Sequence, residues 1–234
     1  MINPLSLSPS CLIESLEFGD EAQPMLVVDD CLADPHAVVA IAARHDYRPI
    51  GPFYPGVRAA VSERVAMQLV KPLLATMQNI FQLNAPPTFF ECFLSIVTTP
   101  PQKLAPIQRL PHFDGVEPER VAVLLYLDRA ERGGTAFYRQ RGTAYESVTA
   151  ERYDEYQINL DRAAARSGMP EARYICGDTA QFERVMAING RFNRMVAYRG
   201  NVLHCADLHG DFIPDPNPLT GRLTLNLFLI APPG

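Results

Sequence analysis

Apolar and polar positions follow two different periods along the chain, and the change comes near residue 88. Before that point, an apolar run at 24–32 predicts a strand. Residues 33–46 predict a short helix, with Asp34 as N-cap and Pro35 at the first helical position. The chain is therefore expected to begin with a strand and a helix.

A second helix is expected over 62–81, where apolar residues recur at helical spacing. Pro72 lies inside this segment. Its ring removes one backbone donor and collides with the preceding turn, so the helix should be kinked or divided there.

From residue 88 onward the pattern is typical of an antiparallel β series. Runs of β-branched and aromatic residues are separated by Pro, Gly and acidic turns, and they occupy 88–99, 107–114, 120–128, 133–141 and 221–230.

Two further features interrupt or continue this series. The stretch 144–176 is polar, rich in helix formers and helical in spacing, and we interpret it as an insertion over one rim. Two apolar runs at 182–188 and 191–200 flank Asn189–Gly190, a strong signal for a two-residue hairpin because both residue types tolerate positive φ.

Length and composition fit one mainly β domain with flanking helices. The chain has 234 residues, of which 47% are hydrophobic, enough for one substantial core. We expect residues 1–85 to form a helical and strand extension packed on a β core at 86–234. The core carries the helical insertion at about 144–176.

Charge and cysteine usage exclude several classes of protein. The net charge is −5 and no stripe of Lys and Arg is present, so nucleic acid is not expected as a partner. The chain has five cysteines, an odd number, and they are scattered along it. This pattern fits reduced thiols. The first residues lack a signal-peptide pattern, and no apolar run approaches the roughly 20 residues that span a bilayer. A cytoplasmic protein without membrane contact is predicted.

Candidate metal chemistry begins at "PHFDG", residues 111–115. If this stretch ends a strand, His112 and Asp114 project from the same face. His204 follows an apolar strand that turns through Gly200–Asn201. Two histidines and one carboxylate are the facial triad of non-haem iron(II) sites, which leave other positions open for a cosubstrate and dioxygen.

Arg222 opens the last expected strand, and Thr224 lies on the same face. A guanidinium can hold a carboxylate through two parallel hydrogen bonds, which lysine cannot imitate. The order His-x-Asp, a long gap, His, and then Arg-x-Thr is far more specific than its first element alone.

With these residues, the sequence resembles the non-haem iron(II), 2-oxoglutarate-dependent oxygenases, and within them the prolyl-4-hydroxylase-like group. The closest local likeness is "PHFDG...ERVAVLLYLDRAERGGTAFY". The resemblance covers roughly 89–230 without the insertion. It implies a double-stranded β-helix, a form of jelly roll, with iron between its two sheets.

The resemblance also implies roles for individual residues. His112, Asp114 and His204 match the iron ligands, and Arg222 matches the residue that binds the distal carboxylate of 2-oxoglutarate. Tyr126 and Thr224 are further candidates for that carboxylate.

The implied activity is that of a dioxygenase. Dioxygen and 2-oxoglutarate would be consumed, and a peptide, an amino acid or a secondary metabolite would be hydroxylated. Because Asp114 is intact, the halogenase variant, in which a small residue replaces this carboxylate, is disfavoured. The sequence leaves a homodimer open.

Bland interpretations stand beside this one. His112 and Asp114 alone would suit a polar turn, and Tyr126 a core tyrosine. His209 and Asp211 form a second His-x-Asp pair, and Cys205 should be buried on the face opposite His204. The insertion could be a substrate lid or a solvated helix.

Three rival functions also remain. One is a jelly-roll module that binds a metal or ligand without catalysis, and one is a cupin-like metalloenzyme that needs no 2-oxoglutarate. The third is a purely structural sandwich.

Overall fold

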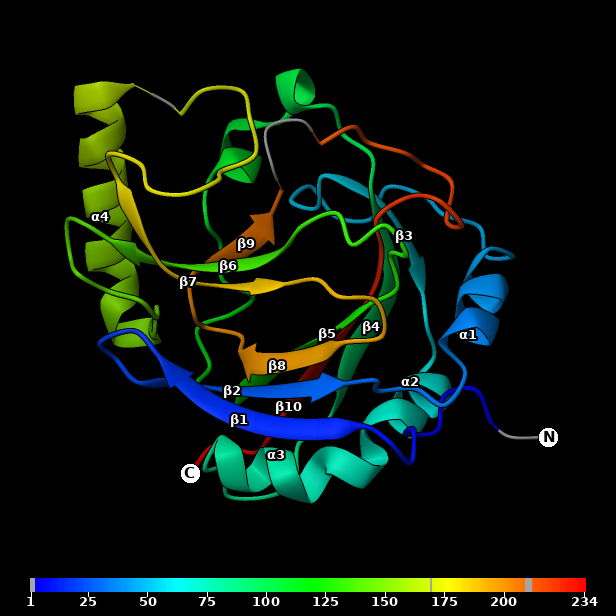
Figure 1. Ribbon diagram of the computed structural model, residues 1–234. Helices are drawn as coiled ribbons and strands as arrows, with labels where there is room; N and C mark the ends of the chain where they lie inside the picture. Colours follow the sequence, from blue (N-terminus) through cyan, green and yellow to red (C-terminus); the bar gives the residue numbers. More distant parts are fainter. Residues whose placement is uncertain (1–2, 169, 209–211) are drawn as a thin grey trace.

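The computed structural model describes residues 3–168, 170–208 and 212–234, which form two antiparallel sheets (Figure 1). The large sheet has the strand order β1-β2-β8-β5-β10-β4-β3, and the small sheet has the order β7-β6-β9. The strands are β1 (Leu12–Phe18), β2 (Gln23–Asp29), β3 (Gly56–Ala60), β4 (Thr88–Val97), β5 (Arg120–Tyr126), β6 (Gly134–Gln140), β7 (Phe182–Asn189), β8 (Met195–Arg199), β9 (His204–Asp207) and β10 (Leu223–Ile230).

The helices follow the sequence prediction closely. Helix α1 (Pro35–Ala42) begins after Asp34, whose carboxylate accepts a hydrogen bond from the Ala37 N–H at 2.9 Å. The second predicted helix is divided at Pro72 into α2 (Glu63–Val70), a 3₁₀ turn at Lys71–Leu73 and α3 (Leu74–Ile80).

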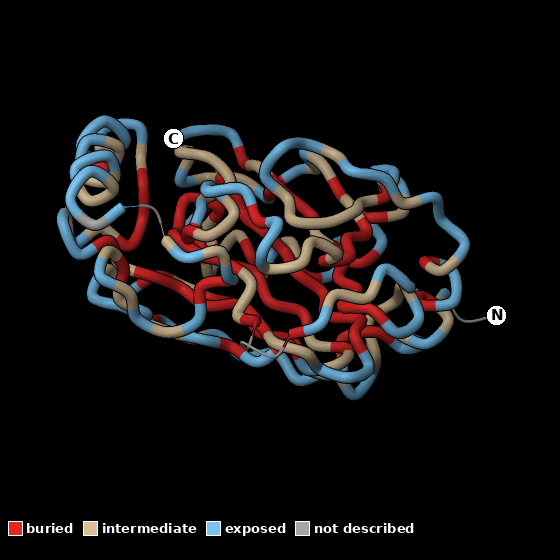
Figure 2. Tube along the Cα trace, turned by 90° about the horizontal axis from the view of Figure 1, so that it is seen from above, coloured by how far each residue is buried: buried red, intermediate tan, exposed pale blue. Residues whose placement is uncertain are grey.

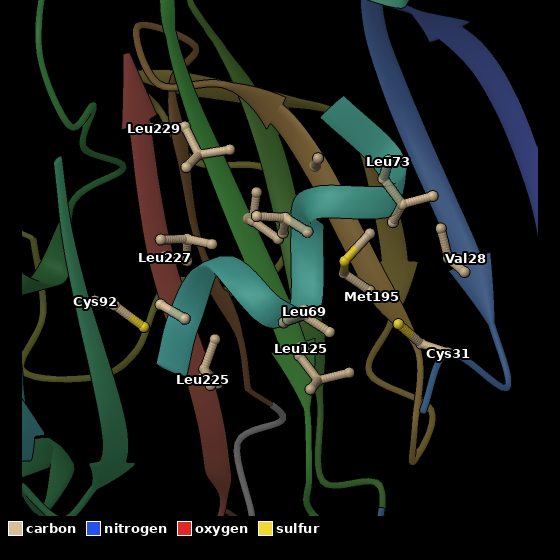
Figure 3. Close-up of a cluster of buried hydrophobic side chains, with 14 of the residues drawn as sticks. Val28, Cys31, Leu69, Leu73, Cys92, Leu125, Met195, Leu225, Leu227 and Leu229 are labelled. Carbon is tan, nitrogen blue, oxygen red and sulfur yellow. The ribbon is translucent and has the colours of Figure 1, made fainter. Parts of the chain in front are cut away.

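Helices α2 and α3 cover the outer face of the large sheet, where the larger apolar core lies. In β10, Leu223, Leu225, Leu227 and Leu229 all point into this core, as the period of two requires. Figure 3 shows Leu225, Leu227 and Leu229 along one side of this strand, and Leu69 and Leu73 on the helical segment that covers the same face.

The inner face of the large sheet looks toward the small sheet. A second apolar cluster fills part of this space and includes Phe137 from β6, Val196 and Tyr198 from β8, and Phe228 from β10. Strand β5 is buried at every position, because its two faces contact the two different clusters.

The expected hairpin at Asn189–Gly190 is wrong. Strand β7 pairs with β6 in the small sheet, whereas β8 pairs with β2 and β5 in the large sheet. The connection therefore crosses between sheets. The residue with positive φ is Asn193 (φ 64°), and its side chain is bonded to the Leu32 backbone at 2.9 and 3.1 Å.

Two other predictions need correction. The expected strand at 107–114 is a 3₁₀ turn at Pro106–Arg109 followed by one isolated bridge at His112. Strands β1 and β3 were not predicted. Together with β2 they give the large sheet three strands from residues 1–85, which the sequence suggested were an extension packed on the core.

The predicted insertion contains one long helix, α4 (Ala150–Ser167), which stands at one end of the molecule with mostly exposed residues (Figures 1 and 2). All five cysteines are free thiols. Among the described residues, no helix combines the length and the apolar character needed to cross a membrane.

Candidate metal centre

His112 and His204 lie side by side because their backbones form an isolated antiparallel bridge. The N–H of each residue donates to the carbonyl of the other at 2.8 Å. His204 is the first residue of β9, directly after the turn at Gly200–Asn201 that the sequence indicated. Asp114 is fixed to the same turn, since its N–H donates to the Gly200 carbonyl at 2.7 Å.

The three side chains converge on one point. A ligand atom from each of His112, Asp114 and His204 lies within 4.8 Å of the others. Asp114 Oδ1 is 3.9 Å from His112 Nε2, and Asp114 Oδ2 is 3.5 Å from His204 Nε2. These separations exceed those of good hydrogen bonds. They leave room between the ligand atoms for one ion to contact all three.

The ring of His204 is held in an orientation that suits metal binding. Its Nδ1 lies 2.9 Å from the Val202 carbonyl oxygen. A carbonyl only accepts, so the hydrogen-bond network assigns the proton to Nδ1 and leaves the lone pair on Nε2. Such a bond from the second ring nitrogen is what fixes metal-bound histidines. The ring of Tyr198 packs edge-on against His204, with centroids 4.8 Å apart.

The electrostatics of the site call for a cation. Asp114 Oδ2 is buried and has no hydrogen-bond partner among the residues that the structure describes. Burial raises the pKa of the Asp114 carboxyl, against the opposing influence of His204, Arg58 and Arg120. A divalent cation would satisfy the orphaned oxygen and favour the ionised carboxylate.

The imidazole of His112 is also suited to a metal ion. Protein atoms crowd this ring although half of its side chain stays reachable by solvent. This desolvation, together with the nearby His204 and Arg58, lowers the pKa of His112 well below its usual value. A neutral imidazole is the form that binds metals, so the donor set fits one divalent cation.

Arg222 lies just before β10 and is only 4% exposed. Its Nε donates to the Arg132 carbonyl at 3.2 Å, and its Nη2 to the Gly134 carbonyl at 2.8 Å. Within the described part of the chain, Arg222 forms no salt bridge with a carboxylate. A guanidinium buried without an anion is costly, so this position is suited to an incoming anion.

Thr224 and Tyr126 lie on the inner face together with Arg222. They are register partners on neighbouring strands β10 and β5. The Thr224 hydroxyl donates to Asn226 Oδ1 at 2.7 Å, and the Tyr126 hydroxyl pairs with Thr135 Oγ1 at 2.6 Å. Both hydroxyls therefore already have protein partners and retain acceptor capacity.

Sequence reasoning missed three residues beside this site. Ser95 on β4 is the partner of Thr224, and Arg58 on β3 is the partner of Ser95. The polar row, defined as Tyr126, Thr224, Ser95 and Arg58, thus crosses four strands on the inner face. Tyr54, which precedes β3, brings its hydroxyl close to Ser95 and Thr224. A charged residue inside the short apolar run "GVRAA" was the available signal.

Other candidates take different places. Cys205 packs in a separate apolar cluster with Leu110 and Tyr138, on the face opposite His204, as expected. His209 and Asp211 lie outside the described residues. Helix α4 contacts the metal centre through Phe113, whose ring lies 6.3 Å from Tyr153 and 5.7 Å from Tyr156. The insertion thus packs directly behind the His-x-Asp segment.

Comparisons with known proteins place the fold. A sequence model described as "Family of unknown function (DUF6445)" matches residues 9–229. No curated protein sequence matches significantly.

Among solved structures, HygX from Streptomyces hygroscopicus with nickel and 2-oxoglutarate bound is 12% identical, with a TM-score of 0.51 over 90% of this chain and 84% of that chain. SnoK, the non-heme alpha ketoglutarate dependent carbocyclase from nogalamycin biosynthesis, is 12% identical, with a TM-score of 0.47 over 89% and 80% of the two chains. The likeness to HygX shows a shared fold.

Proposed function

Because this chain belongs to DUF6445, a family of unknown function, we propose its function from its own site: it is an iron(II)- and 2-oxoglutarate-dependent oxygenase. The observation that carries the proposal is the convergence of His112, Asp114 and His204. It is joined by the buried guanidinium of Arg222, which forms no salt bridge with any described residue. The substrate would be a small molecule or a peptide.

The fold supports this proposal, since HygX, a protein of the same fold, was determined with 2-oxoglutarate bound. In our proposal the two sheets are those of a double-stranded β-helix, and the bridge from His112 to His204 extends the small sheet by one short segment. The stretch from His112 to Tyr138 carries the proposed relation to the prolyl-4-hydroxylase-like group.

His112, Asp114 and His204 would hold the iron(II) ion. Two imidazole nitrogens and one carboxylate oxygen on one side of the ion form the facial arrangement that non-haem iron enzymes use. When bound, iron(II) with 2-oxoglutarate supplies the oxidation of a substrate C–H bond by dioxygen, with succinate and carbon dioxide as coproducts.

Arg222 would bind the distal carboxylate of 2-oxoglutarate. Two backbone carbonyls already hold its Nε and Nη2, so the remaining N–H groups have a fixed direction. This preorganisation lowers the entropy cost of binding an anion. Thr224 and Tyr126 offer hydroxyl oxygens on the same wall.

The surrounding side chains orient the ligands and keep water out. Tyr198 and Phe137 pack on the ring of His204, and the Val202 carbonyl holds the proton on Nδ1. Such support restricts the ligand rotamers and lowers the local dielectric, which strengthens binding of a charged cosubstrate.

The direct test is an anaerobic titration with iron(II), with and without 2-oxoglutarate, followed by the weak visible charge-transfer band of the chelate. We expect the band in the wild type, and we expect it to disappear in His112→Ala and in His204→Ala. His45→Ala is the matched control. His45 is an exposed histidine whose ring is hydrogen-bonded to the Ile41 carbonyl oxygen. A wild-type protein that binds no iron would end the proposal.

Arg222→Ala separates this function from its rivals. An oxygenase that uses 2-oxoglutarate should lose the band and the formation of succinate, while iron binding persists. A cupin-like enzyme without this cosubstrate would keep its turnover in Arg222→Ala. A binding module would bind iron and form no succinate with either protein.

A further inference from the structure

A second guanidinium, that of Arg58, belongs to the same inner face. Arg58 occupies the edge strand β3 and is the far end of the polar row that starts at Tyr126. Two strand spacings of about 4.8 Å separate it from Thr224, so these backbone positions lie roughly 10 Å apart. Arg58 therefore extends from a different strand than Thr224, the neighbour of Arg222.

Arg58 is held on the inner face by aromatic rings. Its guanidinium carbon lies 4.2 Å from the centroid of the Tyr54 ring and 5.1 Å from that of Phe93. These contacts stabilise and aim a cation without neutralising it. The side chain is held in place and keeps its charge available.

The polar atoms around Arg58 are not satisfied by hydrogen bonds of good geometry. Tyr54 Oη lies close to the hydroxyls of Ser95 and Thr224. Among the described residues, however, Arg58 Nε, Tyr54 Oη and Ser95 Oγ are buried without a hydrogen bond. In the parts of the chain that the structure describes, Arg58 forms no salt bridge. Unsatisfied buried polar groups are rare in native proteins and call for an explanation, and a bound anion would supply partners for all three atoms.

Arg58 is also connected to the metal centre through packed aromatic rings. The ring of Phe93, over which its guanidinium lies, packs against the apolar cluster that contains Phe137 and Tyr198, and these two rings pack on His204. A group bound to Arg58 would therefore lie on the same face of the large sheet as this cluster.

Two exposed apolar side chains, which we call the apolar rim, lie on the segments that precede Arg58 and His112. Phe53, 68% exposed, and Ile107, 44% exposed, lie on two segments joined by a hydrogen bond from Gln108 Nε2 to the Pro52 carbonyl at 3.4 Å. The second of these segments leads to His112. An apolar body could pack on this rim while its acidic end reaches Arg58.

We propose that Arg58, supported by Tyr54 and Ser95, binds a carboxylate of the primary substrate, which is an organic acid with an apolar body. This inference rests on the proposed function, because it assumes that Arg222 takes 2-oxoglutarate. Arg58 would thus be the residue that selects the substrate. The substrate carboxylate would bind Arg58, and the carboxylate of 2-oxoglutarate would bind Arg222.

The test uses protein loaded with nickel(II), which does not turn over, and with 2-oxoglutarate, so that the Arg222 position is filled. Benzoate and hexanoate are titrated by calorimetry, beside their neutral amides. We expect both acids to bind the wild type and the amides to bind far more weakly. In Arg58→Met the acid affinity should fall about 10-fold or more, as expected for a lost charge-assisted pair.

Two variants control for structural damage. Arg58→Lys keeps the charge and should restore part of the affinity for the acids. Arg48→Met removes an exposed arginine whose backbone pairs with that of Arg58, and it should bind both acids like the wild type. The affinity for 2-oxoglutarate should fall in Arg222→Met and stay unchanged in Arg58→Met.

Several outcomes would overturn the inference. Acids that fail to bind the loaded wild type, or that bind Arg58→Met equally well, would remove the anion site. A loss of 2-oxoglutarate affinity in Arg58→Met as large as that in Arg222→Met would assign Arg58 to the cosubstrate instead. If 2-oxoglutarate never binds the wild type, the proposed function fails, and the same titration on the metal-free protein still tests Arg58.

Discussion

The two faces of the large sheet differ in whether they contain buried polar atoms without hydrogen bonds. On the outer face, leucines of β10 and residues of α2 and α3 form a hydrophobic core. On the inner face, the polar row, the neighbouring Tyr54 and the metal centre contain buried atoms that lack hydrogen bonds to any described residue: Tyr54 Oη, Arg58 Nε, Ser95 Oγ and Asp114 Oδ2. One sheet thus carries stability on one side and chemistry on the other.

Strand β10 shows how a single sequence serves both purposes. In "LTLNLFLI", the leucines alternate with Thr224, Asn226 and Phe228, which face inward. Because successive side chains point to opposite faces, a substitution at one position changes the contacts on only one face. The comparison therefore predicts that stability and ligand binding respond to different residues of the same strand.

The largest expected effect is on the inner side. His204→Ala should abolish tight metal binding, a loss of more than about 100-fold, because even residues that only orient a ligand contribute about 10–100-fold. Metal content and iron(II) affinity measure this effect. Because the His112 side chain is 50% exposed, thermal unfolding of the metal-free His112→Ala variant should change little, and a large loss of stability there would break the proposed division between the faces.

Leu227→Ala addresses the outer face. Leu227 is fully buried under the helices, so its truncation should lower the free energy of unfolding by about 2–5 kcal/mol. Denaturant unfolding measures the loss. Metal affinity of the folded protein should match that of the wild type, and Leu219→Ala, at a position 47% exposed, should leave the stability nearly unchanged.

A polarity exchange within β4 sharpens the comparison further. Cys92 faces the outer core, where a serine hydroxyl would have no partner, so Cys92→Ser should cost about 1–3 kcal/mol. Ser95 faces inward and its hydroxyl is already unsatisfied. Ser95→Ala should change the stability by less than about 1 kcal/mol. Equal losses in both variants would contradict the assignment of the faces.

An effect smaller than that of Leu227→Ala is expected at the crossing between the sheets. Arg194 holds the Asp29 carboxylate through Nε–Oδ1 at 2.6 Å and Nη2–Oδ2 at 2.8 Å. This hydrogen bonding lowers the pKa of Asp29. Asp29→Asn should cost about 1 kcal/mol at neutral pH, since the pair is partly exposed.

The pH dependence of this effect has a defined sign. Because the pKa is lowered in the folded state, the contribution of Asp29 is present above its unfolded pKa of about 3.9 and is lost as the pH falls through the folded value. The difference in unfolding free energy between wild type and Asp29→Asn should therefore shrink below about pH 4. A difference that grows on acidification would be inconsistent with this pair.

Local signals in the sequence predicted local structure well. Asp34 and Pro35 set the start of α1, and Pro72 divides the second helix, because each acts through its own backbone neighbours. The prediction of a hairpin at Asn189–Gly190 was wrong because strand pairing is not decided by neighbouring residues alone. Whether two runs pair depends on which sheet each joins, and that choice is made by distant strands β2, β5 and β6.

The site shows the same limit. The spacing of His112, Asp114 and His204 indicated a triad, and the structure brings their ligand atoms together. The spacing of residues along the chain did not identify Arg58 and Ser95. Their place beside the site follows from the pairing of β3 with β4 and of β4 with β10, and a lone charged residue in a short apolar run carries no such information.

The backbone bridge between His112 and His204 also bears on how the protein folds. The two residues are distant in the chain, and between them lie strands that pair with both sheets. Contacts of such long sequence separation form slowly, since loop closure must be paid for before they stabilise anything. Iron loading should therefore be a late event that reports completed folding. In a refolding experiment, metal binding should rise with the slowest phase, and earlier binding would show that the ligands meet before the sheets do.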